Sequence, residues 1–262
     1  MGVFMRCLVV VLAATLAVTA PAFAQDHTGE EPHAAPASAH GQHWSYDGPT
    51  GPRYWGRIDP AYAACDTGQQ ESPIDLSNAI DAEIGALDIH WRPLPGRVFD
   101  TGHAIQVETA TGSNMTMGGQ GYQLLQFHVH QPSEHLLNGH RYPLEIHFVH
   151  TAPDGSLAVV GVFAEQGTAN PVLQAVLDAA KSRPEAERPT LDLNGMLPEA
   201  RDYFRYEGSL TTPPCSEVVN WAVLGSPITV STAQIEAFGR LHPGNTRPLQ
   251  PLNRRFLLHS GR

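Results

Sequence analysis

Two histidines stand one residue apart in the segment QFHVH, residues 126–130. Side chains of a β-strand point alternately to opposite faces, so His128 and His130 would share one face while Phe127 and Val129 share the other. A buried imidazole without a polar partner costs free energy, so two of them side by side need a reason. On its own a His-x-His pair is a weak indication of a metal site.

A second segment, LEIHFVH at 144–150, supplies a third histidine. In a strand it would place Glu145, His147 and Val149 on one face. If the two segments pair, His147 joins His128 and His130. Three neutral imidazoles on a rigid sheet match a catalytic zinc site, in which three protein ligands leave the fourth tetrahedral position open. The spacing therefore predicts a catalytic zinc centre formed by His128, His130 and His147.

Two polar residues strengthen this prediction. Gln126 lies two residues before His128, and Glu145 lies two residues before His147, each on the expected ligand face. A metal-bound histidine usually donates its other ring N–H to such a partner, which fixes the tautomer and raises the basicity of the ligand. The alternative is a set of core histidines satisfied by hydrogen bonds alone, and the two same-face partners make it the weaker reading.

We expect short β-strands, separated by glycine and proline, to position these residues. The predicted strands lie at 104–109, 122–129, 144–150, 157–164 and 218–224. Few segments are helical in pattern. Asn170 followed by Pro171 and VLQAVLDAAK has a cap and a proline at the first helical position. A capping-box pattern, STAQ, begins at Ser231, and Gly239 is the expected end of that helix. The chain from 44 to 262 shows no internal repeat and no linker.

The first 24 residues have the features of a secretory signal: a basic Arg6, an apolar run too short to span a bilayer, and a small-residue site that predicts cleavage after Ala24. We therefore expect a soluble, exported protein, periplasmic or secreted, without a membrane anchor. Residues 25–43 are rich in Ala, Pro and His and predict a flexible leader. Its four histidines, His27, His33, His40 and His43, could scavenge metal, but a solvated tail is the favoured interpretation.

The predicted export bears on the oxidation state of the cysteines. Cys7 leaves with the signal, and Cys65 and Cys215 remain as an even pair in an oxidising compartment, so we predict a disulfide between them. The alternative is two free buried thiols. The formal net charge is -10, and no cluster of Lys and Arg supplies a positive surface. Nucleic acid is therefore not an expected partner.

Longer motifs make the chain resemble the α-class carbonic anhydrases, in their exported bacterial form. The resemblance covers essentially all of 44–262, and its motifs occur in the expected order: QESPIDL (70–76), GHAIQVE (102–108), QFHVHQPSEH (126–135), LEIHFVH (144–150), LAVVGVF (157–163), GSLTTPPCSEVVNW (208–221) and NTRPLQPLNRR (245–255). It implies an α+β, β-dominated fold with a large central, twisted, mostly antiparallel sheet and a few short peripheral helices. Cys65 and Cys215 fall where exported bacterial members form a disulfide.

The resemblance also implies a reaction. Zn²⁺ would be bound by His128, His130 and His147, and the enzyme would catalyse the reversible hydration of CO2 to bicarbonate and a proton, a hydro-lyase reaction. Thr211 would accept the hydrogen bond of the zinc-bound hydroxide and donate its own to Glu134, which aims an oxygen lone pair at CO2. By its residues alone, Thr211 would be assigned to a turn before the prolines.

His103 aligns with the family's proton shuttle, a role that suits an imidazole because it titrates near neutral pH. The resemblance places the substrate pocket at Thr212, Val149, Val159, Leu210 and Trp221. Thr101 and Gln106 depart from the better-known animal members, in which asparagine is common at both positions, and would alter the water network that feeds His103. The expected partners are small molecules, and the expected state is a monomer or a homodimer.

Two other functions remain open at this point. A cupin-type metalloprotein is suggested because HVHQPSE fits His-x-His-x3-Glu, which would make Glu134 a ligand for iron or manganese. It requires a downstream Gly-Pro-His motif, which HPGN at 242–245 fits poorly. A non-catalytic zinc-binding protein of the same fold is the second alternative. Such a protein would be expected to lack a ligand, Glu134 or Thr211, and none is missing.

Overall fold

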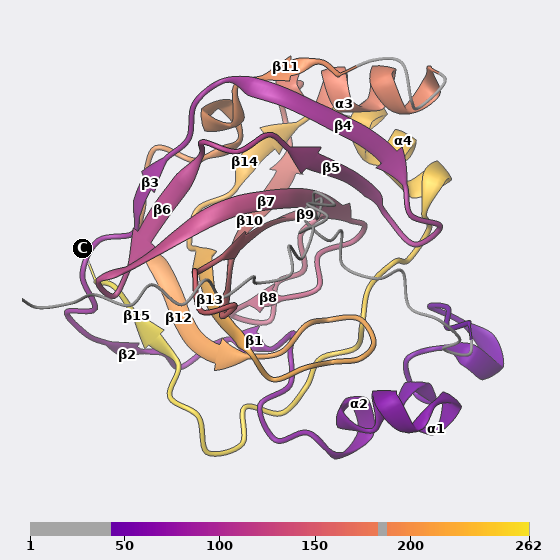
Figure 1. The fold of residues 1–262 in the computed structure, drawn as a ribbon, viewed down its shortest axis with the longest axis vertical. Helices are drawn as coiled ribbons and strands as arrows, with labels where there is room; N and C mark the ends of the chain where they lie inside the picture. Colours follow the sequence, from indigo (N-terminus) through magenta and orange to yellow (C-terminus); the bar gives the residue numbers. More distant parts are fainter. Residues whose placement is uncertain (1–42, 183–187, 262) are drawn as a thin grey trace, which may run out of the picture. The chain divides into compact units, whose positions relative to one another are not determined.

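The computed structural model describes residues 43–182 and 188–261, and strands dominate it (Figure 1). The predicted signal peptide and nearly all of the predicted leader lie outside the described residues. The longer strands are β4 (Leu94–Asp100), β5 (Ile105–Thr109), β7 (Gln120–His130), β9 (Leu144–Thr151), β10 (Leu157–Gln166), β12 (Tyr203–Gly208) and β13 (Val219–Leu224). The shorter ones are β1 (Asp75–Leu76), β2 (Ile80–Asp81), β3 (Asp88–His90), β6 (Asn114–Met117), β8 (Leu136–Leu137), β11 (Thr190–Leu191), β14 (Ile228–Val230) and β15 (Leu258–His259).

Within the described residues, thirteen of these strands form one sheet in the order β11-β4-β5-β7-β9-β10-β13-β12-β15-β2, with β3, β6 and β14 attached at its sides. Most neighbours are antiparallel; β13 and β14 pair with β10 in parallel, as β2 does with β15. Figure 1 shows the strong twist of this sheet. The expected fold class, a β-dominated α+β fold with a mostly antiparallel sheet, is confirmed.

The register of β7 and β9 decides where the histidines lie. Phe127 is opposite Phe148, and His128 is opposite His147. The phenylalanines belong to the larger apolar core, on one face of the sheet. The alternation of the pleat therefore puts the histidines on the other face, where Val149 joins the smaller core cluster.

Helices α3 (Pro171–Lys181) and α4 (Thr232–Leu241) pack against the larger core. Asn170 caps α3 by accepting from two backbone amides, and Ser231 forms the predicted capping box. The expected stop at Gly239 is wrong, because α4 continues to Leu241. A Cβ on Gly239 would lie 3.2 Å from the Gln131 side chain, so this glycine permits close packing of the helix.

Two short helices, α1 (Trp55–Ile58) and α2 (Ala64–Thr67), precede the sheet and were not expected from the sequence. Three short 3-10 turns complete the described elements: Gly48–Thr50, Pro60–Tyr62 and Leu193–Met196. Cys65 on α2 forms a disulfide with Cys215, as predicted. Both cysteines pack with Trp55 in a third apolar cluster. The disulfide thus ties α2 to the loop between β12 and β13.

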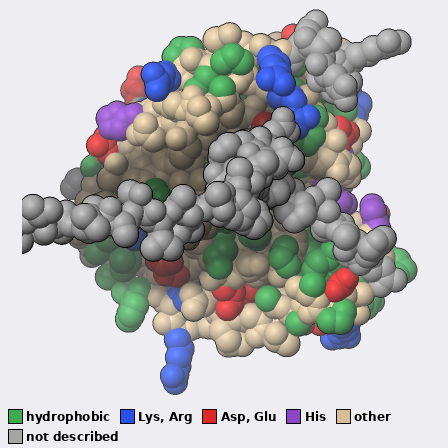
Figure 2. All heavy atoms as spheres, in the orientation of Figure 1, with side chains coloured by type: hydrophobic (Ala, Val, Ile, Leu, Met, Phe, Trp, Pro, Cys, Tyr) green, Lys and Arg blue, Asp and Glu red, His purple; other side chains and the backbone are tan. Residues whose placement is uncertain are grey.

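Two surface properties bear on the expected partners. Lys and Arg side chains visible on the face in Figure 2 are scattered and do not gather into a patch. None of the helices in the described part of the chain combines the length and the apolar character that a membrane span requires.

Candidate metal centre and active-site pocket

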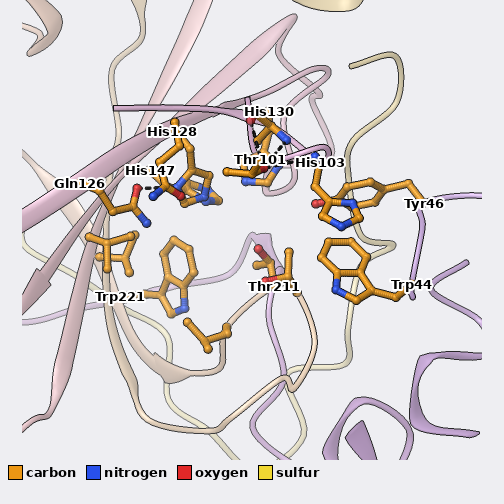
Figure 3. Close-up of a pocket in the computed structure, with 16 residues that line it drawn as sticks. Trp44, Tyr46, Thr101, His103, Gln126, His128, His130, His147, Thr211 and Trp221 are labelled. Carbon is orange, nitrogen blue, oxygen red and sulfur yellow. Dashed lines mark hydrogen bonds between the residues drawn. The ribbon is translucent and has the colours of Figure 1, made fainter. Parts of the chain in front are cut away.

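His128, His130 and His147 meet on one face of the sheet (Figure 3). One ring nitrogen from each lies within 4.8 Å of the others. The ring centroids are 5.0 Å apart for His128 and His130, 5.3 Å for His128 and His147, and 4.5 Å for His130 and His147. Strands β7 and β9 thus bring together the three residues that the sequence singled out.

The second nitrogen of each ring has an acceptor. Nδ1 of His128 lies 2.9 Å from Oε1 of Gln126, and Nε2 of His147 lies 2.8 Å from Oε1 of Glu145. Nδ1 of His130 lies 2.7 Å from the backbone carbonyl of Asn245. Because carbonyl, amide and carboxylate oxygens only accept, each of these nitrogens carries the proton. The remaining nitrogens, Nε2 of His128 and His130 and Nδ1 of His147, therefore present lone pairs to the cavity.

Burial keeps the three rings neutral. Desolvation is the main reason that the pKa of His128 lies well below its usual range, with the neighbouring histidines adding to the effect. Burial also lowers the pKa of His130 and His147, the latter against the opposing influence of Glu145. Nε2 of His130 is buried and has no hydrogen-bond partner among residues 43–182 and 188–261. Three neutral imidazoles and one orphaned lone pair fit a divalent cation, and an all-imidazole set suits zinc.

A second group, His135, Glu145 and His147, has similar spacing but a different character. Glu145 lies 2.7 Å from Nδ1 of His135 and accepts from the backbone amides of Glu134 and His135. Burial alone would raise the pKa of Glu145, yet His135 and His147 hold it well below its usual range. Nε2 of His135 meets the hydroxyl of Tyr206 at 2.6 Å. This group is a satisfied hydrogen-bond network that orients His147, and both carboxylate oxygens of Glu145 are engaged by N–H donors within it.

Glu134 lies behind the histidine cluster. Its Oε1 accepts from the backbone amide of Arg247 at 2.7 Å, and its Oε2 lies 3.5 Å from Nε2 of His130. Burial raises the pKa of Glu134 to about 7, against the lowering influence of His147, the Arg247 amide and Thr211. The Thr211 hydroxyl is thus close to this carboxylate, although Oε2 has no hydrogen-bond partner of ordinary geometry among the described residues. The two groups are therefore neighbours.

A cavity of about 260 Å³ opens above the histidines. All five residues expected at the substrate site line it: Val149, Val159, Leu210, Thr212 and Trp221. Val149, Val159 and Trp221 are buried and come from β9, β10 and β13, which are neighbours in the sheet. One wall of the cavity is therefore apolar, and it adjoins the nitrogen cluster.

His103 stands at the opposite side of this cavity (Figure 3). Its ring stacks on Trp44 with centroids 3.6 Å apart and lies 5.6 Å from the ring of His43. Tyr46 also lines the cavity. No sequence pattern marks Trp44 or Tyr46, because they lie 59 and 57 residues before His103 in a segment without a motif.

Thr101 and Gln106 line the same cavity, as expected for residues of a water network. The Thr101 hydroxyl accepts from the backbone amides of His103 and Ala104, so it is largely used within its own turn. Sequence reasoning also missed Asn245 and Arg247. Both lie in the motif NTRPLQPLNRR, but nothing in that motif shows that its backbone reaches His130 and Glu134.

Known proteins share this architecture and sequence. The family model described as "Eukaryotic-type carbonic anhydrase" matches residues 50–261. A carbonic anhydrase of Pectobacterium atrosepticum is 37% identical over 221 residues, covering 83% of this chain and 91% of its own. The structure of an α-carbonic anhydrase from Thermovibrio ammonificans, in complex with sulfanilamide, superimposes with a TM-score of 0.80 at 40% identity and covers 84% of this chain and 100% of that one.

A relative with another name is also similar: dioscorin DB3S of Dioscorea polystachya is 34% identical over 224 residues, which cover 80% of this chain and 84% of its own. The match to the family model spans most of the chain, so the cupin interpretation is wrong. The sequence, the sheet and the relatives agree on one conclusion. The chain belongs to the eukaryotic-type, or α-class, family of carbonic anhydrases and is an enzyme of that family.

Proposed function

We propose that the protein is a zinc-dependent carbonic anhydrase that catalyses the reversible hydration of CO2 to bicarbonate and a proton. The observation that carries this proposal is the convergence of three imidazole lone pairs beside an apolar cavity. His128, His130 and His147 would hold the ion. Zinc, when bound, supplies a nucleophile near neutral pH by lowering the pKa of a water molecule to about 7, a value known from carbonic anhydrase itself.

Thr211 and Glu134 would set the direction of attack. A hydroxyl that donates its proton to an ionised carboxylate can only accept from the group in front of it. Oε1 of Glu134 already accepts from the Arg247 amide, and the Thr211 hydroxyl is close enough to this carboxylate to lower its pKa. This arrangement fixes the nucleophile's own hydrogen and leaves a lone pair aimed at the substrate. A bound dication would favour the charged form of Glu134 that this role requires.

The apolar wall would receive CO2. Val149, Val159 and Trp221 offer no hydrogen bonds to the substrate from their side chains within the cavity, and Trp221 uses its Nε1 to donate to the carbonyl of Ser209. A small, uncharged molecule can enter such a site without displacing well-bound water. Thr212 also lines the cavity, and its polar side chain would suit the charged product.

His103 would move the proton that each turnover releases. Its ring lies on the cavity wall and is half-buried, so it borders both the cavity and solvent. Burial, His43 and His242 lower its pKa, while Asp100 raises it. A group that must accept and release a proton at neutral pH works best when its pKa lies near the working pH.

The decisive test is CO2 hydration by the purified protein before and after removal of zinc with a chelator. We expect about one zinc per chain, rapid hydration, loss of activity on chelation and recovery on adding zinc back. His147→Gln should bind little zinc and show little activity while retaining the far-UV circular dichroism of the parent. Full zinc occupancy without hydration would leave only the zinc-binding alternative.

We also propose export, with the signal peptide cleaved after Ala24. The disulfide between Cys65 and Cys215 supports this, because disulfides persist in oxidising compartments. Expression in a Gram-negative host, fractionation and N-terminal sequencing check it. A chain that begins at Gln25 in the periplasm or medium is expected, and an intact Met1 in the cytoplasm would contradict the proposal.

A further inference from the structure

The turn that carries His103 is fixed by its own side chains. Oδ1 of Asp100 accepts from the backbone amide of Gly102 at 2.7 Å. The Thr101 hydroxyl accepts from the amides of His103 and Ala104 at 3.2 and 3.0 Å. Gly102 has a φ of +83°, a conformation that favours glycine. The backbone of His103 is thus held in a tight turn at the end of β4.

A second segment, just after α4, contacts this turn through His242 and Asn245. Nε2 of His242 lies 2.8 Å from Oδ1 of Asp100, and the His242 side chain is only 14% exposed. Nδ2 of Asn245 donates to the carbonyl of His103 at 3.1 Å. The carbonyl of the same Asn245 accepts from His130. The segment therefore connects the turn of His103 with a proposed zinc ligand.

We propose that the Asp100–His242 pair positions His103 for proton transfer: it holds the turn in place and balances the charges that surround the ring. This inference rests on the proposed function of His103 as the proton shuttle. His242 and Asp100 are positioning residues in it, because neither lines the cavity.

An ordinary surface ion pair would contribute little to stability and nothing to the reaction. Two observations separate this pair from such a case. His242 is largely enclosed, and the carboxylate oxygen that it meets is the same oxygen that binds the Gly102 amide. The two atoms are 2.8 Å apart, so a proton on His242 places its positive charge directly against the carboxylate of Asp100.

The charges act on His103 with opposite signs. In the described part of the chain, the titratable groups that face its ring are His43 at 5.6 Å, Tyr46 at 6.3 Å, His242 and Asp100. Burial has the largest effect and lowers the pKa of His103. Positive charge on His43 and His242 lowers this pKa further, and Asp100 raises it. While both members of the pair are present, their effects partly cancel. Removal of one leaves the other uncompensated.

Two variants should therefore shift the pKa of His103 in opposite directions. Asp100→Asn keeps an acceptor for the Gly102 amide but loses the negative charge, so the pKa of His103 should fall. His242→Gln loses the positive charge, so the pKa should rise. Proton NMR titration of the His103 ring in the zinc-loaded protein measures both. Asp81 and His259 form a matched pair, with 2.9 Å between Oδ1 and Nδ1, remote from the cavity, so His259→Gln is the control and should leave the pKa unchanged.

The same variants should separate proton transfer from CO2 hydration. The parameter kcat/KM reports the steps up to the first irreversible event, whereas kcat also includes release of the proton. We expect kcat in weak buffer to fall about 3–10-fold in Asp100→Asn and His242→Gln, part of the 10²-fold or more that general acid–base groups contribute. The value of kcat/KM should not change, and added imidazole should restore kcat.

His103→Ala distinguishes the two ways in which this inference can fail. If His103→Ala leaves kcat in weak buffer unchanged, His103 is not the shuttle and the proposed function is wrong on this point. If His103→Ala lowers kcat but the pair variants change neither kcat nor the pKa of His103, the shuttle stands and the inference about Asp100 and His242 is overturned. Equal losses in kcat and kcat/KM that imidazole does not restore would also overturn it, since they indicate general damage to the site.

Discussion

Oε1 of Gln126 accepts a hydrogen bond from Nδ1 of His128 at 2.9 Å, across two residues of the same strand. The proton on Nδ1 leaves Nε2 with its lone pair directed at the cavity. Gln126 therefore selects the tautomer of His128 that can bind a metal, without touching the metal itself. The interaction is local in sequence, because residues two apart in a strand share a face.

Gln126→Leu tests this relationship. The variant keeps the size of the side chain but removes the acceptor, so the two tautomers of His128 become more equal. We expect zinc affinity to fall about 10–100-fold, the usual effect of losing such a partner. Competition with a chromophoric chelator measures it. Gln120→Leu, at the exposed start of β7, is the matched control and should bind zinc like the parent. Equal affinities in both variants would show that Gln126 does not orient His128.

Thr211→Ala tests the proposed orienting role of the hydroxyl. The variant should retain zinc, because Thr211 is not among the three residues whose nitrogens converge. Its kcat/KM should fall about 10²-fold or more, the effect of losing one well-placed hydrogen-bonding group in the transition state. Stopped-flow CO2 hydration measures the loss. Thr211→Ser keeps the hydroxyl and should recover most of the activity; a serine variant as slow as the alanine variant would contradict the role.

The local part of this site could be predicted from sequence, since strand alternation relates His128, His130 and Gln126 to one another, and Glu145 to His147. Predicting side-chain faces from strand alternation fails where a strand contains a bulge, as β7 does. A bulge between Leu124 and Gln126 shifts the register, so Leu124 before it and Phe127 after it both face the larger core. Alternation extended back from Phe127 across the bulge would have put Leu124 on the wrong face.

Contacts between distant segments could not be predicted in this way. Asn245 meets His130 across 115 residues, and the Arg247 amide meets Glu134 across 113. Both contacts use backbone groups, which any residue type supplies, so no side-chain pattern marks them. The contact between Asp100 and His242 could not be predicted either, because the two residues lie far apart in the sequence. The disulfide was predictable, because two cysteines in an oxidising compartment leave only one pairing.

That disulfide leads to a third prediction. It closes a loop of 150 residues, and Nη2 of Arg247 donates to the carbonyl of Cys65 at 2.9 Å. Cys65→Ser with Cys215→Ser should lower the free energy of unfolding by about 2–5 kcal/mol. It should also lower kcat/KM, because Cys215 follows Thr211 by four residues in the same loop. Urea denaturation and CO2 hydration measure the two effects. Unchanged stability and activity after reduction of the parent protein would contradict the prediction.

His150 gives the fourth prediction, which concerns pH. Its ring is fully buried, accepts from Nε1 of Trp91 at 3.2 Å, and donates through Nδ1 to the carbonyl of Phe148 at 2.9 Å. Burial lowers its pKa to about 4, although the backbone contacts oppose the shift. Above the unfolded pKa of about 6.5, His150 is neutral in both states and its contribution to stability is complete.

Below that pH the unfolded chain binds a proton that the folded protein does not, so the free energy of unfolding falls as the pH drops toward the folded pKa. The slope from this residue is about 1.4 kcal/mol per pH unit, and the total loss by pH 4 is about 3 kcal/mol. His150→Gln should be less stable than the parent at pH 7.5, and its slope should be shallower by this amount, while the slope that remains comes from the other buried histidines, His128, His130 and His147. Urea denaturation of zinc-free protein at several pH values between 7.5 and 4.5 measures it without interference from metal loss. His90→Gln, which removes an exposed histidine on β3, should keep the parent slope, and an equally steep slope in His150→Gln would show that another group causes the acid sensitivity.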